Sequence, residues 1–175
     1  TIDTPIATTH LAYCLHDLAF SCQALSQSNL ALGYCIMAEK RYSRSNGETE
    51  CSESRGSLRV LLSAVLKTLP DVSHAKSYLR ARLHEAENAC PNEQTESTQL
   101  WLRQQLLGFL SEIDERSERI FLVTAICESI LRQNSSAIDL AFCENQFAIE
   151  MLNNDRFADA RAHNQAATKL LAKHA

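Results

Sequence analysis

Glycine and proline are scarce in this chain, with four glycines and three prolines among 175 residues. Together these two residues normally make up roughly 12% of a globular protein. The turns that join β-strands use both residue types heavily, so a β-sandwich, a β-barrel or a doubly wound sheet is disfavoured. Apolar residues make up 45% and charged residues 22% of the chain, as in an ordinary folded domain. We therefore predict an all-α protein.

Apolar residues recur at spacings of three and four along most of the chain, which predicts an antiparallel bundle of six or seven helices. The clearest stripe includes Leu58, Leu62 and Leu69. Pro70 is expected to end that helix, because the residue before a proline is pushed out of helical geometry. Asp71 is then well placed to cap the next helix.

The positions of the remaining helices follow from polar interruptions. Residues 5–43 are expected to be helical, as one helix or as two separated by the polar residues at 26–29. Residues 44–57 are rich in serine and glutamate and are expected to form a flexible loop. A second polar break covers residues 91–97. The apolar stripe after it extends to Gln133, which predicts one long helix as the spine of the domain.

The last part of the chain is expected to form a helical hairpin. Residues 137–152 and 156–173 both carry helical periodicity. The residues between them, Asn153, Asn154 and Asp155, are typical of a tight turn. As domains we predict a first helical unit over residues 1–90 and a second unit over residues 91–175 that contains the spine helix and the hairpin.

Net charge and cysteine content exclude several classes of protein. The net charge of −4 comes with no basic stripe, so no nucleic-acid binding is expected. Seven cysteines, none closer than eight residues to the next, fit neither a disulfide scaffold nor a paired zinc site. We predict small buried thiols in a cytoplasmic protein, without membrane insertion because no long apolar run exists. The chain opens on Thr1 rather than Met, which leaves open whether it is a fragment of a longer protein.

Catalytic and cofactor motifs are missing from the sequence. Four glycines cannot supply a glycine-rich phosphate loop. His10 and Cys14 share one helical face and could ligate zinc or form a Cys–His dyad, but nothing nearby supplies further ligands or an oxyanion hole. Asp159 and His163 are expected to form an ordinary exposed pair. We predict no enzyme, no cofactor and no metal.

Two other segments have more than one interpretation. Residues 112–119 alternate acidic and basic side chains and are expected to form a solvated face. Trp101 lies between two leucines, and three consecutive apolar residues cannot all face one core. Trp101 is therefore expected to pack at the edge of the bundle or to meet a partner. In an oligomerising scaffold, Leu100, Trp101 or Leu107 would instead form a self-complementary patch.

The terminal hairpin, FAIEMLNNDRFADARAHNQAATKLL, resembles those of tetratricopeptide repeats and of microtubule-interacting-and-transport (MIT) domains. HAKSYLRARLHEAENA and STQLWLRQQLLGFLSEIDERSERI resemble the third helix of an MIT domain, which suggests a tandem of two packed three-helix units. ERSERIFLVTAICESILRQNSSAIDLAF, followed by the hairpin, is similar to the tandem MIT region at the C-terminus of autophagy-initiating serine/threonine kinases. In these families a small residue lets two helices approach, and the aromatic after the turn staples them. The residues that match this pattern are Phe147, Ala148, Met151, Phe157, Ala160 and Ala167.

The resemblance implies a non-catalytic module that binds a short helical or extended segment of a partner protein. In such kinases the partner is a regulatory subunit, and the module brings the kinase to the autophagy initiation site. The alternatives are an oligomerising helical scaffold, a tetratricopeptide-like peptide binder or a Cys/His enzyme. Phe157 is either part of the binding surface or only the staple of the hairpin. We predict a surface for an acidic, leucine-bearing segment that comprises Phe157, Arg161, Lys169, Leu170, Lys173 and Trp101.

Overall fold

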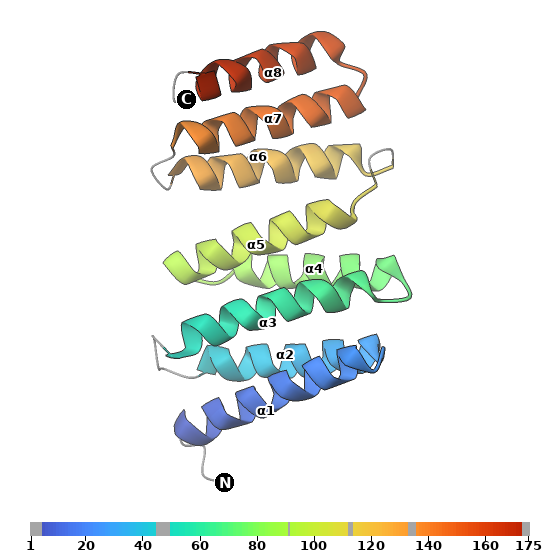
Figure 1. The fold of residues 1–175 in the computed structure, drawn as a ribbon, viewed down its shortest axis with the longest axis vertical. Coiled ribbons are helices and arrows are strands. Elements are labelled where there is room, and N and C mark those ends of the chain that lie inside the picture. The colour runs from blue at the N-terminus through green and yellow to red at the C-terminus, as the bar shows by residue number, and fades with distance from the viewer. Residues whose placement is uncertain (1–4, 45–49, 91, 112–113, 133–135, 173–175) are drawn as a thin grey trace. The chain divides into compact units, whose positions relative to one another are not determined.

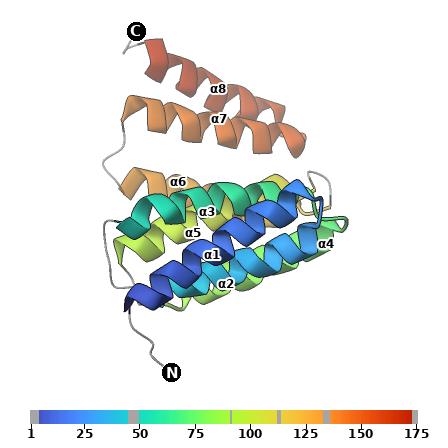
Figure 2. The same ribbon diagram turned by 60° about the horizontal axis from the view of Figure 1, so that its bottom comes forward.

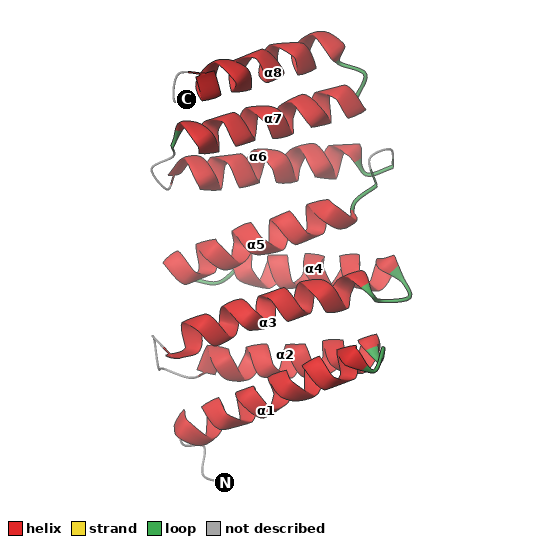
Figure 3. Ribbon diagram, in the orientation of Figure 1, coloured by secondary structure: helices red, strands yellow, loops and turns green. Residues whose placement is uncertain are grey.

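The computed structural model describes residues 5–44, 50–90, 92–111, 114–132 and 136–172. All regular secondary structure in these ranges is α-helical (Figure 3), which confirms the prediction of an all-α protein. The described residues form eight helices rather than the six or seven predicted (Figure 1). In chain order they are α1 (Pro5–Ala24), α2 (Ser28–Arg44), α3 (Glu50–Lys67), α4 (Val72–Glu87), α5 (Glu93–Phe109), α6 (Arg116–Arg132), α7 (Ala137–Asn153) and α8 (Phe157–Ala172).

Two helices, rather than one, cover the first part of the chain. Ser26 has a φ angle of 58°, a left-handed conformation that the interior of a helix does not contain. The amide of Gln27 donates to the carbonyl of Cys22 at 2.8 Å and so closes the end of α1. The polar residues at 26–29 therefore mark a true break.

The loop predicted over residues 44–57 is partly helical, because α3 already begins at Glu50. Residues 45–49 lie outside the described part of the chain. The guanidinium of Arg55 donates to the carbonyl of Tyr42 at 2.6 Å, which holds the first turns of α3 against the end of α2. Polar composition misled the prediction here, since glutamate and arginine are also good helix formers.

The prediction of one long spine helix in the middle of the chain is wrong, because two helices take its place. α5 ends at Phe109 and α6 begins at Arg116. Leu110 has extended backbone angles, with φ −75° and ψ 138°. The amide of Asp114 then donates to the hydroxyl of Ser111 at 3.2 Å. Short polar side chains that bond to nearby backbone compete with helix continuation.

Side-chain caps define where α4 and α5 begin. Asp71 caps α4 as predicted, since its Oδ1 accepts from the amide of Ser73 at 2.8 Å. The polar break predicted at 91–97 is shorter than expected, because α5 begins within it. There the Asn92 side chain accepts from the amide of Thr95, and the Thr95 hydroxyl accepts from the amide of Asn92, both at 2.8 Å. This reciprocal capping box starts the helix early.

The terminal hairpin is confirmed, with α7 and α8 antiparallel and joined by a short turn (Figure 1). Ser136 starts α7 through a capping box with Asp139. Asp155 adopts a left-handed φ of 59° in the turn, which Asp tolerates better than most residues. The amide of Arg156 donates to the carbonyl of Met151 at 2.9 Å and closes the end of α7.

The chain divides into two compact units, residues 1–75 and residues 76–175, and the division falls inside α4. The boundary predicted after residue 90 lies beyond the end of that helix. In the first unit α1, α2 and α3 all contact one another as a three-helix bundle (Figure 2). Small residues on α1 and α2 allow close approach, and larger ones on α2 and α3 fill the core. The buried residues include Ala12, Ala19, Ala31, Ala38, Tyr42, Leu62, Val65 and Leu66.

In the second unit each of α5, α6 and α7 contacts the helix that follows it in the chain. α4 is tied to α5 by the Gln99 side chain, whose Nε2 donates to the carbonyl of Ala86 at 2.9 Å. A buried cluster between α6 and α7 contains Val123, Cys127 and Cys143. Apolar residues from α5, α6 and α7 complete the core, namely Leu102, Leu106, Leu122, Ile126 and Met151.

The described cysteines differ in burial, which corrects the prediction that they are small buried side chains. Cys35, Cys127 and Cys143 are buried, but Cys14 and Cys90 are exposed. Burial raises the pKa of the Cys35 thiol to about 12 and also raises the pKa values of the Cys127 and Cys143 thiols. The buried thiols therefore behave as apolar side chains.

Residues 112 and 113 lie outside the described part of the chain, and residues 114–119 are not the solvated face that their alternating charges predict. Glu115 accepts from Nζ of Lys76 at 2.5 Å and from Nη2 of Arg80 at 2.9 Å. Arg80 also pairs with Glu118 at 2.6 Å. Basic side chains of α4 thus reach the carboxylates at the start of α6. Arg119, in the same segment, is buried.

Glu115 provides a test of this charge cluster through its pH dependence. The Lys76 ammonium and the Ser111 amide hold the pKa of the Glu115 carboxyl at about 2, below an ordinary value of about 4.3. A depressed carboxyl pKa stabilises the fold above the unfolded-state value, and this stabilisation is lost as the pH falls through the folded-state value. We expect Glu115→Gln to be less stable than the wild type at about pH 6 and to approach it between about pH 4 and pH 2.

Urea unfolding across this pH range measures the difference. Glu96 is exposed on α5 and makes no ion pair with another described residue. Glu96→Gln is the matched control and should run parallel to the wild type at every pH. A Glu115→Gln deficit that stays constant down to about pH 2 would contradict the assigned carboxylate contacts.

Candidate functional site

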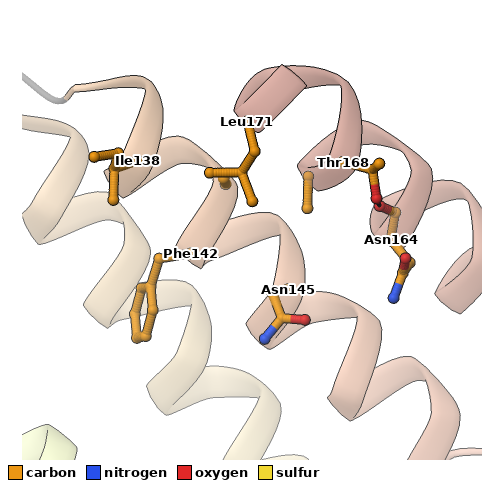
Figure 4. A pocket seen from close by; sticks show the side chains of 8 residues that line it. Ile138, Phe142, Asn145, Asn164, Thr168 and Leu171 are labelled. Atoms are coloured by element: carbon orange, nitrogen blue, oxygen red, sulfur yellow. Dashed lines mark hydrogen bonds between the residues drawn. The ribbon is translucent and has the colours of Figure 1, made fainter. Parts of the chain in front are cut away.

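An open groove lies between α7 and α8, with a volume of about 340 Å³. Ala141 and Ala167 are buried and form its floor. Side chains from both helices form its walls, as Figure 4 shows. The wall residues are Ile138, Phe142 and Asn145 on α7, and Asn164, Thr168 and Leu171 on α8.

Alanines set the spacing between the two helices. Ala141 and Ala148 on α7 are buried, as are Ala160 and Ala167 on α8. Within each helix the two alanines are seven residues apart and so share one face. Small residues at a helix contact allow the two backbones to approach closely, and the larger neighbouring side chains then stand beside the contact as walls. The predicted small-residue contact of the hairpin is therefore present.

The α7 wall belongs to a longer exposed stripe of apolar side chains. Ile138, Phe142, Ile149 and Leu152 are all exposed, Ile138 by 67%. Together with Asn145 they repeat at spacings of four and three, which places them on one side of the helix. Over these residues a helix rises by about 21 Å. Exposed apolar side chains that gather on one side of a helix are typical of interaction surfaces, whereas single exposed apolar residues are ordinary.

The polar groups of the groove are neutral. Asn145 and Asn164 are exposed on opposite walls, and each side-chain amide offers both donors and an acceptor. Thr168 adds a hydroxyl, which donates to the carbonyl of Asn164 at 2.9 Å. These groups match the hydrogen-bonding needs of a peptide backbone, which presents N–H and C=O groups in alternation.

A second cavity of about 210 Å³ adjoins the groove at Phe142. Phe142 lines both cavities, and its ring extends from α7 toward α6 (Figure 4). The second cavity is mostly apolar, with two glutamine amides beside it. Its other lining residues are Gln104, Leu107, Val123, Ile126, Cys127 and Gln146.

The structure separates the residues predicted to form the binding surface. Phe157 lies four residues before Arg161, and Arg161 lies three residues before Asn164. All three therefore share the groove side of α8. Lys169 is exposed beside Thr168 but a quarter turn or more away from the groove stripe, and Leu170 is half-buried. Lys173 lies outside the described residues.

Phe157 does not staple the hairpin, because its side chain is 63% exposed. It is the first residue of α8, directly after the turn, and the buried alanines already make the helix contact. Trp101 is half-buried on α5 and does not line the α7–α8 groove. Of the two interpretations of Phe157, its exposure is compatible with a surface residue rather than with a staple.

The sequence interpretation missed the α7 wall and Leu171. The signal was present, since Ile138, Phe142 and Ile149 repeat at helical spacing on the same helix as Ala141 and Ala148. An apolar stripe normally predicts a buried face, so the spacing alone does not show that this stripe is exposed. α7 carries apolar residues on an exposed side as well as on its buried side, whereas an ordinary surface helix is apolar only on its buried side.

His163 has a different partner from the one predicted. Its Nδ1 lies 2.7 Å from Oε2 of Glu144, and its ring packs on Phe147 with centroids 5.6 Å apart. Asp159 instead pairs with Nε of Arg156 at 2.7 Å. The His163–Glu144 contact joins α8 to α7 and lies outside the groove lining.

Other kinds of site find less support in the structure. The described residues include no group of three or more His, Cys, Asp or Glu side chains arranged to hold a metal ion. His10 and Cys14 are both exposed on α1. No helix within the described ranges is long and apolar enough to cross a membrane. No protein-family model, curated protein or solved structure matches this chain. The α7–α8 groove is therefore the candidate functional site.

Proposed function

We propose that this protein is a non-catalytic interaction module that binds a short segment of a partner protein in the α7–α8 groove. The observation that carries the proposal is the combination of a small-residue floor, exposed apolar walls and facing amides. Apolar walls supply binding energy through buried area. The amides fix the orientation of a bound chain, as the few polar groups of a binding site commonly do.

The amides favour an extended segment over a helical one. A helix satisfies its backbone N–H and C=O groups internally and would leave Asn145 and Asn164 without backbone partners. An extended chain presents these groups along its whole length. The stripe of about 21 Å accommodates roughly six extended residues.

The charge around the groove favours an acidic segment. None of the residues that line the groove is charged. Arg161 is exposed on the groove side of α8 and forms no ion pair with another described residue. Lys169 is also exposed and lies near the same end as Leu171. An acidic segment that carries leucine would place its apolar side chain between Ile138 and Leu171 and its charge toward these cations.

The resemblance to MIT domains also implies a module that binds a segment of a partner protein. The three-helix arrangement of residues 1–75 supports an MIT-like first unit. The second unit contains most of α4 and four further helices, so it is larger than one three-helix unit. We propose a cytoplasmic module of this kind, with the regulatory partner of an autophagy-initiating kinase as one candidate ligand.

Selection from a library of random peptides tests the proposed ligand chemistry directly. We expect the full chain to enrich peptides that combine leucine with aspartate or glutamate over a short stretch. The recovered peptides should compete with one another for one site. Enrichment of basic peptides, or of peptides without an apolar anchor, would contradict the proposal.

Arg161 gives a kinetic test with a recovered peptide. Arg161→Glu is expected to slow association several-fold at low ionic strength, because charges at the rim of an interface mainly steer encounter. The difference should shrink as salt is added. Arg132→Glu, which changes an exposed arginine on α6, is the control and should leave association much nearer to the wild-type rate. Equal effects of both variants would show only the influence of total charge.

A further inference from the structure

α1 carries an exposed apolar stripe that its own bundle does not cover. Leu11 and Leu18 are exposed, as is Leu25, by 70%. Leu25 directly follows the last residue of α1, and its amide donates to the carbonyl of Ser21 at 3.1 Å, which continues the helical bonding. Cys14 is exposed between these leucines, and Cys22 is half-buried. Their spacing places all five on one side of the helix. The other side of α1 packs within the bundle through Ala12, Leu15 and Ala19, which are buried.

The order of residues along this stripe is the same in both directions. Starting from Leu18, a cysteine lies four residues away on each side, at Cys14 and Cys22, and a leucine lies seven residues away on each side, at Leu11 and Leu25. A twofold axis that passes beside Leu18 therefore brings like against like when two α1 helices meet antiparallel. Such a self-complementary patch is what an isologous contact between two copies requires.

We propose that α1 is a self-association surface, on which the α1 stripe of a second copy packs antiparallel about Leu18. In this arrangement Leu18 contacts Leu18 of the other copy, and Leu11 lies against its Leu25. Cys14 then faces Cys22 across the interface. This surface lies in the first unit and is independent of the α7–α8 groove proposed for peptide binding.

The charge of α1 is compatible with a second copy of the chain on this stripe. None of the five stripe residues is charged, and Asp17 is the only acidic residue described in α1. A chain with a net charge of −4 repels its own copies at long range. A neutral face is the place where two copies can approach closely, whereas a partner of opposite charge would find nothing on this stripe to pair with.

The extent of the stripe determines the strength of the dimer. At the rise of an α-helix, the stripe from Leu11 to Leu25, one residue beyond the end of α1, is about 21 Å long. A contact of one helix with one helix over this length falls short of the roughly 800 Å² per partner that a standard stable interface buries. The dimer is therefore expected to be weak and to depend on concentration, with monomers at low micromolar concentration.

Disulfide trapping tests the geometry. Mild oxidation of the concentrated full chain by copper phenanthroline, with oxygen as the electron acceptor, should join Cys14 of one copy to Cys22 of the other. Within one helix these two residues are separated by about 12 Å, which is too far for an intramolecular disulfide. Peptide mapping of the non-reduced dimer identifies the pair. Predominant Cys14–Cys14 links would indicate a parallel contact, and predominant Cys90 links would indicate random collision, and either result would overturn the proposal.

Sedimentation equilibrium provides the second measurement. The average mass of the wild type, kept reduced, should rise toward twice the monomer mass as concentration approaches the millimolar range. Leu18→Glu and Leu25→Glu should each remain monomeric while keeping the wild-type helix content. Val60→Glu changes an exposed apolar residue on α3 and should still dimerise. A wild type that stays monomeric throughout, or a Val60→Glu variant that loses dimerisation equally, contradicts the α1 interface.

Discussion

Glu150→Ala is expected to lower the free energy of unfolding by about 3–5 kcal/mol, because it leaves the buried Arg119 guanidinium without its carboxylate. Glu150 is only 2% exposed on α7, and Arg119 is buried on α6. Nη2 of Arg119 lies 2.7 Å from Oε1 of Glu150, and Nε lies 3.2 Å from Oε2. This two-point geometry is the strong form of an ion pair.

The same guanidinium also closes the end of α5. Nη1 of Arg119 donates to the carbonyl of Leu110 at 3.0 Å and to that of Leu107 at 3.2 Å. A helix end leaves its last carbonyls without partners inside the helix. Arg119 therefore links three helices, and the loss of Glu150 affects all of them.

Chemical denaturation measures this effect, with two controls. Asp159→Ala breaks the exposed Arg156–Asp159 pair and is expected to cost at most about 0.5 kcal/mol. Combining Arg119→Met with Glu150→Leu removes both charges and should be more stable than Glu150→Ala alone, although the Leu107 and Leu110 carbonyls then lose their donor. A Glu150→Ala cost close to that of Asp159→Ala would contradict the buried ion pair.

Ile138→Glu and Leu171→Glu are each expected to weaken binding of a selected peptide about 30-fold or more, as loss of an interface hot spot does. Each change puts a charge on an apolar wall of the α7–α8 groove. Ile138 is 67% and Leu171 is 50% exposed, so the thermal midpoint should change little. Fluorescence anisotropy with a labelled peptide measures the affinity.

Phe121→Glu is the matched control for these two variants. Phe121 is an exposed apolar residue on α6 and does not line the groove. Its substitution should leave peptide affinity unchanged. If all three variants weaken binding alike, the effect follows total charge rather than the groove.

The helices themselves could be predicted from the sequence because apolar spacing and caps are local signals. Pro70, Asp71 and Ser136 each mark a boundary through the geometry of their own backbone or side chain. The break between α5 and α6 was missed because the apolar stripe continues across it. There, the amide of Ser111 donates to a carboxylate oxygen of Glu115 and the amide of Asp114 donates to the hydroxyl of Ser111. These local bonds between side chains and backbone prevail over the periodicity.

Ion pairs between residues far apart in the chain could not be predicted from the sequence. Arg119 sits in a run of alternating charges that is typical of a solvated helix face. Its partner, Glu150, lies 31 residues further along the chain. No local pattern distinguishes a buried arginine from an exposed one when the compensating carboxylate comes from another helix.

For the candidate site, the sequence indicated the hairpin but not its open side. The chemistry of Lys169 and Leu170 suits an acidic, leucine-bearing segment, but the sequence does not show which side of α8 meets α7. The buried alanines decide that orientation, since Ala160 and Ala167 turn toward α7. Leu171 then lies in the groove, whereas Leu170 lies on the other flank.

Site-specific photocrosslinking tests the groove most directly. A benzophenone amino acid replaces Thr168, which lines the groove, or Ala162, which is exposed on another side of the same helix. With a selected acidic, leucine-containing peptide, we expect a crosslinked product from the Thr168 position, and excess unlabelled peptide should suppress it. The Ala162 position should give little or none. Strong crosslinking from Ala162 together with none from Thr168 would show that the peptide binds elsewhere and that the α7–α8 groove is not the binding site.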